Sequence, residues 1–192
     1  MTENRQAAER QPIHHELERV RADLHHLVAR ATAAELSRRT DGTRWTNQQM
    51  LWHMAFGYLI VRRLLPLVRF FGLLPDRYSR AFAAVLNSGT RPFHLINYLG
   101  SRGGALVFHG PRLTRQLDRT LNGLRRRLDA ETEDALARRM HFPVDWDPFF
   151  RDTMTLAEVY RYGTQHYDFH RAQLTLEAVL GEGPSPLREP ER

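Results

Sequence analysis

The chain carries one helical pattern twice, and this repeat restricts its possible folds more than any other feature. Residues 12–30 and 111–128 both place leucines and other apolar residues at the three- and four-residue intervals of one helix face. Each stretch is followed by a short polar segment, TAAELSRR or DAETEDALARR, then by a loop and a second apolar helix. Two similar helical hairpins predict an all-α four-helix bundle in which the second helices of the two hairpins face each other.

Both of these second helices have a clear start signal. Thr46 is followed by Gln49, and Thr155 is followed by Glu158, which is the spacing of a capping box. The first of the two helices contains the most hydrophobic stretch of the chain, yet three arginines interrupt it, and a membrane-spanning helix rarely tolerates that. We therefore expect a buried helix that ends or kinks near Pro66.

The remaining segments predict one domain with flexible ends. Residues 1–11 are polar, and residues 181–192 are charged and rich in glycine and proline, so we expect disorder in both. Residues 12–180 form the bundle, with a closing helix that runs to about Leu180. The connection 72–110 has several glycine and proline breaks and favours only short helices, at residues 78–86 and 93–99. Its aromatic residues could form a lid or the surface of a homodimer.

The composition excludes several kinds of chemistry. The chain has no cysteine, so disulfides, thiolate nucleophiles and zinc–sulfur sites are excluded. All 28 basic residues are arginine, so Schiff-base chemistry and a Walker A lysine are excluded too. The net charge of +6 is modest, and no nucleic-acid-binding motif is present, so we expect no specific nucleic-acid binding. No signal peptide is visible, which predicts a cytoplasmic protein.

Two histidines in the closing helix are the best candidates for a functional site. His166 and His170 stand four residues apart, which places both imidazoles on one helix face, one turn apart. That face is also the apolar one, and imidazoles turned toward a core need a partner for their nitrogens. A metal ion is one such partner; a hydrogen-bonded or solvated pair is the alternative, since no glutamate completes an HExxH motif.

Three further residues complete the candidate site. His53 lies in the second turn of the facing apolar helix, so a three-histidine metal site is the most specific prediction. Gln173, close after His170, could orient its imidazole, or could be a surface residue. Tyr162, one turn before His166, could line a pocket, although packing in the core is favoured.

The segments RWTNQQMLWHM and TLAEVYRYGTQHYDFHRAQL resemble the DinB/YfiT-like superfamily in its Trp-Ser/Thr opening and its His-x-x-x-His-x-x-Gln closing helix. The resemblance covers most of residues 12–180 but not the connection 72–110. It implies a four-helix bundle in which His53, His166 and His170 bind a divalent metal, zinc or nickel. Characterised relatives include transferases and isomerases that use bacillithiol, mycothiol or glutathione.

Three functions are therefore open. A three-histidine site leaves a coordination position free, and in a chain without cysteine a thiol nucleophile must come from a cosubstrate such as mycothiol. This favours a thiol-dependent transferase or isomerase acting on a small molecule, with Arg62, Arg63 or Arg161 as the anchor for an anionic group. A hydrolase using metal-bound water would need a base such as Asp145, Asp168 or Glu177. A non-enzymatic metal-binding or oligomerisation module is the third alternative, associated with membranes through residues 58–74.

Overall fold

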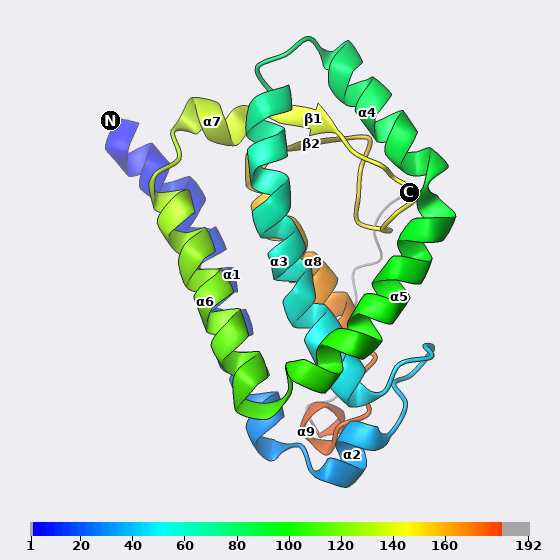
Figure 1. Ribbon diagram of the computed structural model, residues 1–192. Helices are drawn as coiled ribbons and strands as arrows, with labels where there is room; N and C mark the ends of the chain where they lie inside the picture. Colours follow the sequence, from blue (N-terminus) through cyan, green and yellow to red (C-terminus); the bar gives the residue numbers. More distant parts are fainter. Residues whose placement is uncertain (1, 182–192) are drawn as a thin grey trace.

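The computed structural model of the chain describes residues 2–181, with side chains from Arg10 onwards, and consists almost entirely of helices (Figure 1). In this part of the chain the helices are α1 (Thr2–Arg30), α2 (Ala33–Ser37), α3 (Asn47–Phe71), α4 (Asp76–Ser88), α5 (Thr90–Val107), α6 (Gly110–Asp129), α7 (Glu133–Ala137), α8 (Leu156–Arg171) and α9 (Glu177–Leu180). Strands β1 (Arg139–His141) and β2 (Thr153–Thr155) form one small antiparallel sheet. The all-α prediction is confirmed.

The four long helices α1, α3, α6 and α8 form the bundle. α3 packs along α8, and α1 packs along both α6 and α8. The predicted leucine seams supply the core: Leu17 and Leu24 of α1 and Leu117 and Leu124 of α6 are all fully buried. The helices α3 and α8, which follow Thr46 and Thr155, therefore face each other at the centre of the molecule, as the repeat predicts.

The repeat extends to the backbone that precedes each capped helix. Thr46 forms a β-bridge with Arg39, and Thr155 pairs with Arg139 at the end of the β1–β2 sheet. Both threonines accept a hydrogen bond from the backbone of the third helical residue, and both capping boxes are complete. These matched contacts fix where α3 and α8 begin, and hence where the histidines on them lie.

The predicted start of the first helix is wrong: α1 begins at Thr2 rather than near Pro12, so residues 2–11 are helical. We expected α3 to end or kink near Pro66; it does not end there but continues to Phe71. Proline removes the hydrogen bond to the carbonyl four residues earlier. That carbonyl, of Arg62, accepts a hydrogen bond from Nη1 of Arg127 at 3.3 Å, which replaces the lost backbone donor.

The closing helix also ends earlier than predicted. α8 stops at Arg171, and the separate turn of α9 reaches Leu180. The chain leaves the helix because Asn47 of α3 holds it: its amide oxygen accepts the backbone N–H of Thr175 at 3.0 Å, and its Nδ2 donates to the Thr175 hydroxyl at 2.9 Å. The predicted disordered tail beyond Gly181 lies outside the described residues.

The connection between α3 and α6 is more helical than its glycines and prolines suggest. α4 and α5 are longer than the expected segments 78–86 and 93–99, and Gly89 alone joins them. Figure 1 shows them (green) as one side of the molecule, away from α1 (blue). α5 packs on α3, so this connection forms one wall of the region around His53.

No helix in residues 2–181 combines the length and the apolar character that crossing a membrane requires. The structure describes a single chain, so the homodimer and the cytoplasmic location stay predictions.

Candidate metal centre

Close contact between α3 and α8 brings the three histidines together. Two glycines allow this contact. A Cβ on Gly57 of α3 would lie 2.8 Å from Nδ1 of His166, and a Cβ on Gly163 of α8 would lie 2.7 Å from Cε1 of Tyr58. Since real Cβ atoms do not approach other atoms so closely, each glycine makes room for a ring from the opposite helix.

The three imidazoles form one compact cluster. One nitrogen from each of His53, His166 and His170 can be chosen so that all three lie within 4.8 Å of one another. The ring centroids are separated by 4.9 Å, 4.7 Å and 4.5 Å. Nitrogens bound to one tetrahedral zinc at about 2.0–2.1 Å are about 3.3 Å apart, so a small contraction would close the cluster around an ion.

Hydrogen bonds orient two of the rings. Nδ1 of His170 donates to the amide oxygen Oε1 of Gln173 at 2.8 Å. Nδ1 of His53 lies 3.0 Å from the hydroxyl of Ser101 on α5, which can accept its proton. In both rings Nε2 then keeps its lone pair for a metal, and such partners hold a ligand imidazole in one tautomer and one orientation.

The third ring lacks such a partner. Nδ1 of His166 is buried without a hydrogen bond, and its Nε2 is 3.8 Å from Oδ2 of Asp147, which is too far for one. A buried polar atom left unsatisfied costs on the order of 1–3 kcal/mol. An ion bound by His166 would use one of these nitrogens, so the unpartnered ring fits a metal ligand.

Burial keeps all three imidazoles neutral. It lowers the pKa of His166 to about 4, and burial together with neighbouring His166 lowers the pKa of His170 to about 4. The pKa of His53 falls well below its usual value for the same reasons, burial first and then the two other histidines. Since a metal binds the deprotonated ring, a cluster that is neutral at pH 7 is ready to bind one.

One acidic residue that the sequence did not indicate reaches this cluster. Asp147, in the loop between β1 and β2, has a largely buried carboxylate, and burial raises its pKa. Its Oδ2 accepts a hydrogen bond from the Tyr162 hydroxyl at 2.9 Å, and its Oδ1 accepts one from the backbone of Phe149 at 2.9 Å. Tyr162 thus connects the loop to α8 beside His166, with its ring 5.8 Å from that imidazole.

The acids and arginines proposed from sequence lie elsewhere. Asp145 is exposed, Asp168 pairs with Arg19 at 2.7 Å, and Glu177 is exposed on α9. The three candidate anchors, Arg62, Arg63 and Arg161, are also exposed. Arg62 and Arg63 are nine and ten residues beyond His53, which places them roughly 14 Å further along α3.

Aromatic rings pack against the histidine cluster. The ring of Trp45 has its centroid 4.3 Å from the centroid of His53. The same Trp45 ring stacks on Tyr98 of α5, with 6.4 Å between the two centroids. Phe169 lies 5.1 Å from His170 and 5.4 Å from Phe149. These aromatic neighbours lower the local dielectric constant and so strengthen the interaction of an ion with the imidazoles, while Phe169 itself stays 36% exposed to solvent.

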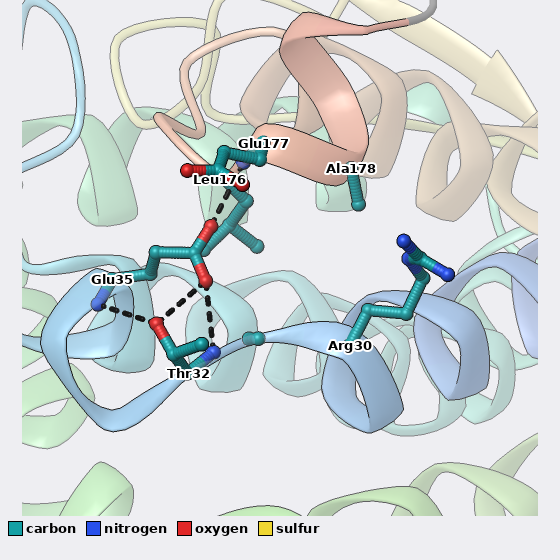
Figure 2. Close-up of a pocket in the computed structure, with 7 residues that line it drawn as sticks. Arg30, Thr32, Glu35, Leu176, Glu177 and Ala178 are labelled. Carbon is teal, nitrogen blue, oxygen red and sulfur yellow. Dashed lines mark hydrogen bonds between the residues drawn. The ribbon is translucent and has the colours of Figure 1, made fainter.

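One surface recess, of about 320 Å³, is separate from this cluster. It lies between α2 and α9 (Figure 2). Its main polar residue, Glu35, accepts hydrogen bonds from the backbone of Glu177 at 2.9 Å and from the backbone and hydroxyl of Thr32. These bonds lower the pKa of Glu35 to about 2, and they show a carboxylate that joins two helices rather than one free for a ligand.

A four-helix bundle with three neutral imidazoles between its facing helices fits the class of bundle proteins that bind a metal ion in their core. Comparison with known families agrees: the profile of the DinB superfamily matches residues 16–174. The chain therefore belongs to the DinB superfamily, and the resemblance seen in its sequence is confirmed. No curated protein and no solved structure gave a match.

Proposed function

We propose that the protein is a metal-dependent enzyme in which His53, His166 and His170 hold one divalent metal, zinc or nickel. The observation that carries this proposal is the compact cluster of three buried imidazoles, one of them without a hydrogen bond at Nδ1. Three protein ligands leave a position free for a substrate or nucleophile, which is typical of catalytic rather than structural sites.

The chain's own residues would orient the metal ligands and pack aromatic rings beside them. Gln173 and Ser101 hold two of the imidazoles by their Nδ1 atoms. Trp45 packs beside His53, and Phe169 packs beside His170. A divalent metal bound there would act as a Lewis acid that lowers the pKa of a bound thiol or water.

The nucleophile that fits best is an external thiol. The chain has no cysteine and no lysine, so it lacks the side chains most often used as strong nucleophiles. A low-molecular-weight thiol such as mycothiol would supply one. We therefore propose a thiol-dependent transferase or isomerase that acts on a small electrophilic molecule.

Hydrolysis is the second candidate, and the position of Asp147 favours it. The Asp147 carboxylate lies beside His166 and is held by Tyr162, so it could accept a proton from a water at the site. It replaces Asp145, Asp168 and Glu177, which point elsewhere, as the base such a reaction needs.

Metal content and thiol consumption test the proposal together. The purified protein should contain about one zinc or nickel per chain and should consume mycothiol, bacillithiol or glutathione in the presence of an electrophile. His166→Ala should lose both the metal and the activity. His26→Ala is the matched control, because His26 is exposed on α1, and it should keep both.

Other outcomes separate the alternatives. Metal-dependent hydrolysis without any thiol would favour the second candidate. A metal-free protein with full activity, or a His166→Ala variant that keeps its metal, would contradict the proposed site. A metal-loaded protein without activity toward any substrate would leave a non-enzymatic metal-binding module.

A further inference from the structure

Charge is distributed very unevenly along the chain. Residues 42–117 contain ten arginines and a single acidic residue, Asp76, whereas the other 21 acidic residues lie outside this stretch. Asp76 is itself 3.6 Å from a guanidinium nitrogen of Arg139. The helices built from this stretch therefore present positive charge with almost no negative charge to balance it.

Exposed apolar side chains are concentrated in the same stretch. Of the twelve large hydrophobic residues that are exposed in the described part of the chain, nine lie between residues 70 and 107. They are Phe70, Leu73, Tyr78, Val85, Leu95, Ile96, Leu99, Leu106 and Val107, and the last seven of these lie on α4 and α5. Soluble proteins expose single apolar residues routinely, but seven along two consecutive helices mark an interaction surface.

On α5 these side chains form one continuous stripe. Leu95, Ile96, Leu99, Leu106 and Val107 recur at helical spacing and are each 51–77% exposed. At about 100° per residue the stripe lies opposite Ser101 and Ala105, which are buried against the bundle. α5 therefore has two apolar faces, and the bundle covers only one of them.

Arginines flank the exposed stripe. Arg91 and Arg102 are exposed on α5, and Arg77 and Arg80 are exposed on α4. None of the four lies within salt-bridge distance of a carboxylate among the described residues, although Arg77 contacts the hydroxyl of Tyr78 and Arg102 lies over the ring of Tyr98. Their charge is thus available to an anionic partner.

We propose that the outer face of α4 and α5 docks on the surface of an anionic phospholipid bilayer. Apolar side chains on one helix face, with arginines beside them, are what an interfacial membrane helix requires. The leucines and isoleucine would enter the boundary between headgroups and acyl chains, and the arginines would contact lipid phosphates. The helices lie on the membrane and do not cross it.

Other occupants fit the observations less well. A second copy of the chain would bring together two arginine-bearing faces whose one acidic residue, Asp76, is already paired with Arg139, and like charges would oppose this contact. A nucleic acid would leave the apolar stripe against phosphates. A helical peptide binds in a groove, and the recess between α2 and α9 and the one beside His109 are both lined by residues outside this stripe.

The proposed docking surface and the candidate metal centre lie on opposite faces of α5. Ser101 contacts His53, and Tyr98 stacks on Trp45, whereas Leu99 between them points outward. One helix therefore separates the proposed membrane surface from the histidine cluster. The docking proposal does not depend on the metal, since the two faces use different residues.

Cosedimentation with lipid vesicles tests the proposal. The protein should bind vesicles of phosphatidylcholine mixed with phosphatidylglycerol, should bind vesicles of phosphatidylcholine alone far more weakly, and should dissociate from the mixed vesicles at high salt. The variant Ile96→Ser/Leu99→Ser/Leu106→Ser should bind at least tenfold more weakly. Because all three side chains are exposed, it should keep its melting temperature.

A charge-matched pair separates specific docking from general attraction. Arg91→Gln/Arg102→Gln should reduce the vesicle partition coefficient by tenfold or more, since an interfacial arginine contributes about 1 kcal/mol. Arg119→Gln/Arg126→Gln removes the same charge from exposed positions on α6 and should bind almost as well as the unchanged protein. Equal losses in the two pairs would overturn the proposal.

Two other results would also overturn it. The first is failure of the unchanged protein to bind anionic vesicles. The second is a dimer in sedimentation velocity that the triple serine variant converts to a monomer, without any difference in vesicle binding; the stripe would then be a contact between two copies.

Discussion

A methyl group added at Gly57 should disrupt the candidate site without the replacement of any histidine. The Cβ of Gly57→Ala would lie 2.8 Å from Nδ1 and 3.2 Å from Cε1 of His166, so the ring or the α8 backbone must move by about 0.6 Å to reach ordinary contact. Metal–ligand distances tolerate deviations of only about 0.2 Å. We therefore expect the affinity for zinc to fall on the order of tenfold or more.

The stability of the variant follows from two opposing terms. Alanine in place of glycine favours a helix by about 1 kcal/mol. Forcing a methyl group into a filled contact costs about 1–3 kcal/mol. The free energy of unfolding of Gly57→Ala should therefore fall by about 0–2 kcal/mol, and the loss of zinc affinity should be the larger effect.

Gly100→Ala is the matched control. Gly100 is helical like Gly57, but nothing lies within 4 Å of the position its Cβ would take. This variant should gain up to about 1 kcal/mol in stability and bind zinc normally. Urea unfolding and zinc titration against a competing chelator would measure both quantities. If Gly57→Ala matched Gly100→Ala in both, the close contact between α3 and His166 would not position the site.

Three further predictions follow from the same cluster. Gln173→Ala should reduce metal affinity by about 10- to 100-fold, measured by chelator competition, because Nδ1 of His170 loses its acceptor; unchanged affinity would exclude an orienting role. The unfolded metal-free protein binds more protons than the folded one between pH 6.5 and 4, because the folded pKa values of His166 and His170 are lowered to about 4. Its free energy of unfolding should thus decrease as the pH falls through this range, and a flat profile in urea titrations would contradict the neutral cluster. Asp147→Asn should leave the fold intact but lower the rate of any metal-dependent hydrolysis by about 10²–10⁴-fold, whereas equal rates would remove Asp147 as the base.

Local signals in the sequence were sufficient for much of this arrangement. The capping boxes at Thr46 and Thr155 are read from neighbouring residues, and they fix where α3 and α8 begin. The four-residue spacing of His166 and His170, with His53 on a second buried helix, follows from helix geometry alone. Helix geometry pairs only His166 with His170; the prediction that His53 meets them comes from the repeat and from the resemblance to the DinB/YfiT-like superfamily.

Other features depend on contacts between distant segments, which no local pattern reports. The early end of α8 requires Asn47, which is far from Thr175 in the sequence. The continuation of α3 past Pro66 uses a guanidinium from α6.

Asp147 lies in a loop without periodicity, and its carboxylate is positioned by the hydroxyl of Tyr162 and the backbone N–H of Phe149. Sequence reasoning favoured Tyr162 as a packing residue, and its ring is indeed buried. The sequence did not indicate the hydrogen bond from the Tyr162 hydroxyl to Asp147. A tyrosine can be buried and still make a polar contact through its hydroxyl, so burial does not exclude such a bond.

X-ray absorption spectroscopy of the zinc-loaded protein would test the central claim most directly. We expect one zinc per chain with three imidazole nitrogens at about 2.0–2.1 Å and a solvent oxygen in the remaining position. His53→Ala should remove one imidazole from this shell or abolish zinc binding. A spectrum without imidazole scattering, or one that stays the same in His53→Ala, would show that the metal is not held by these three histidines.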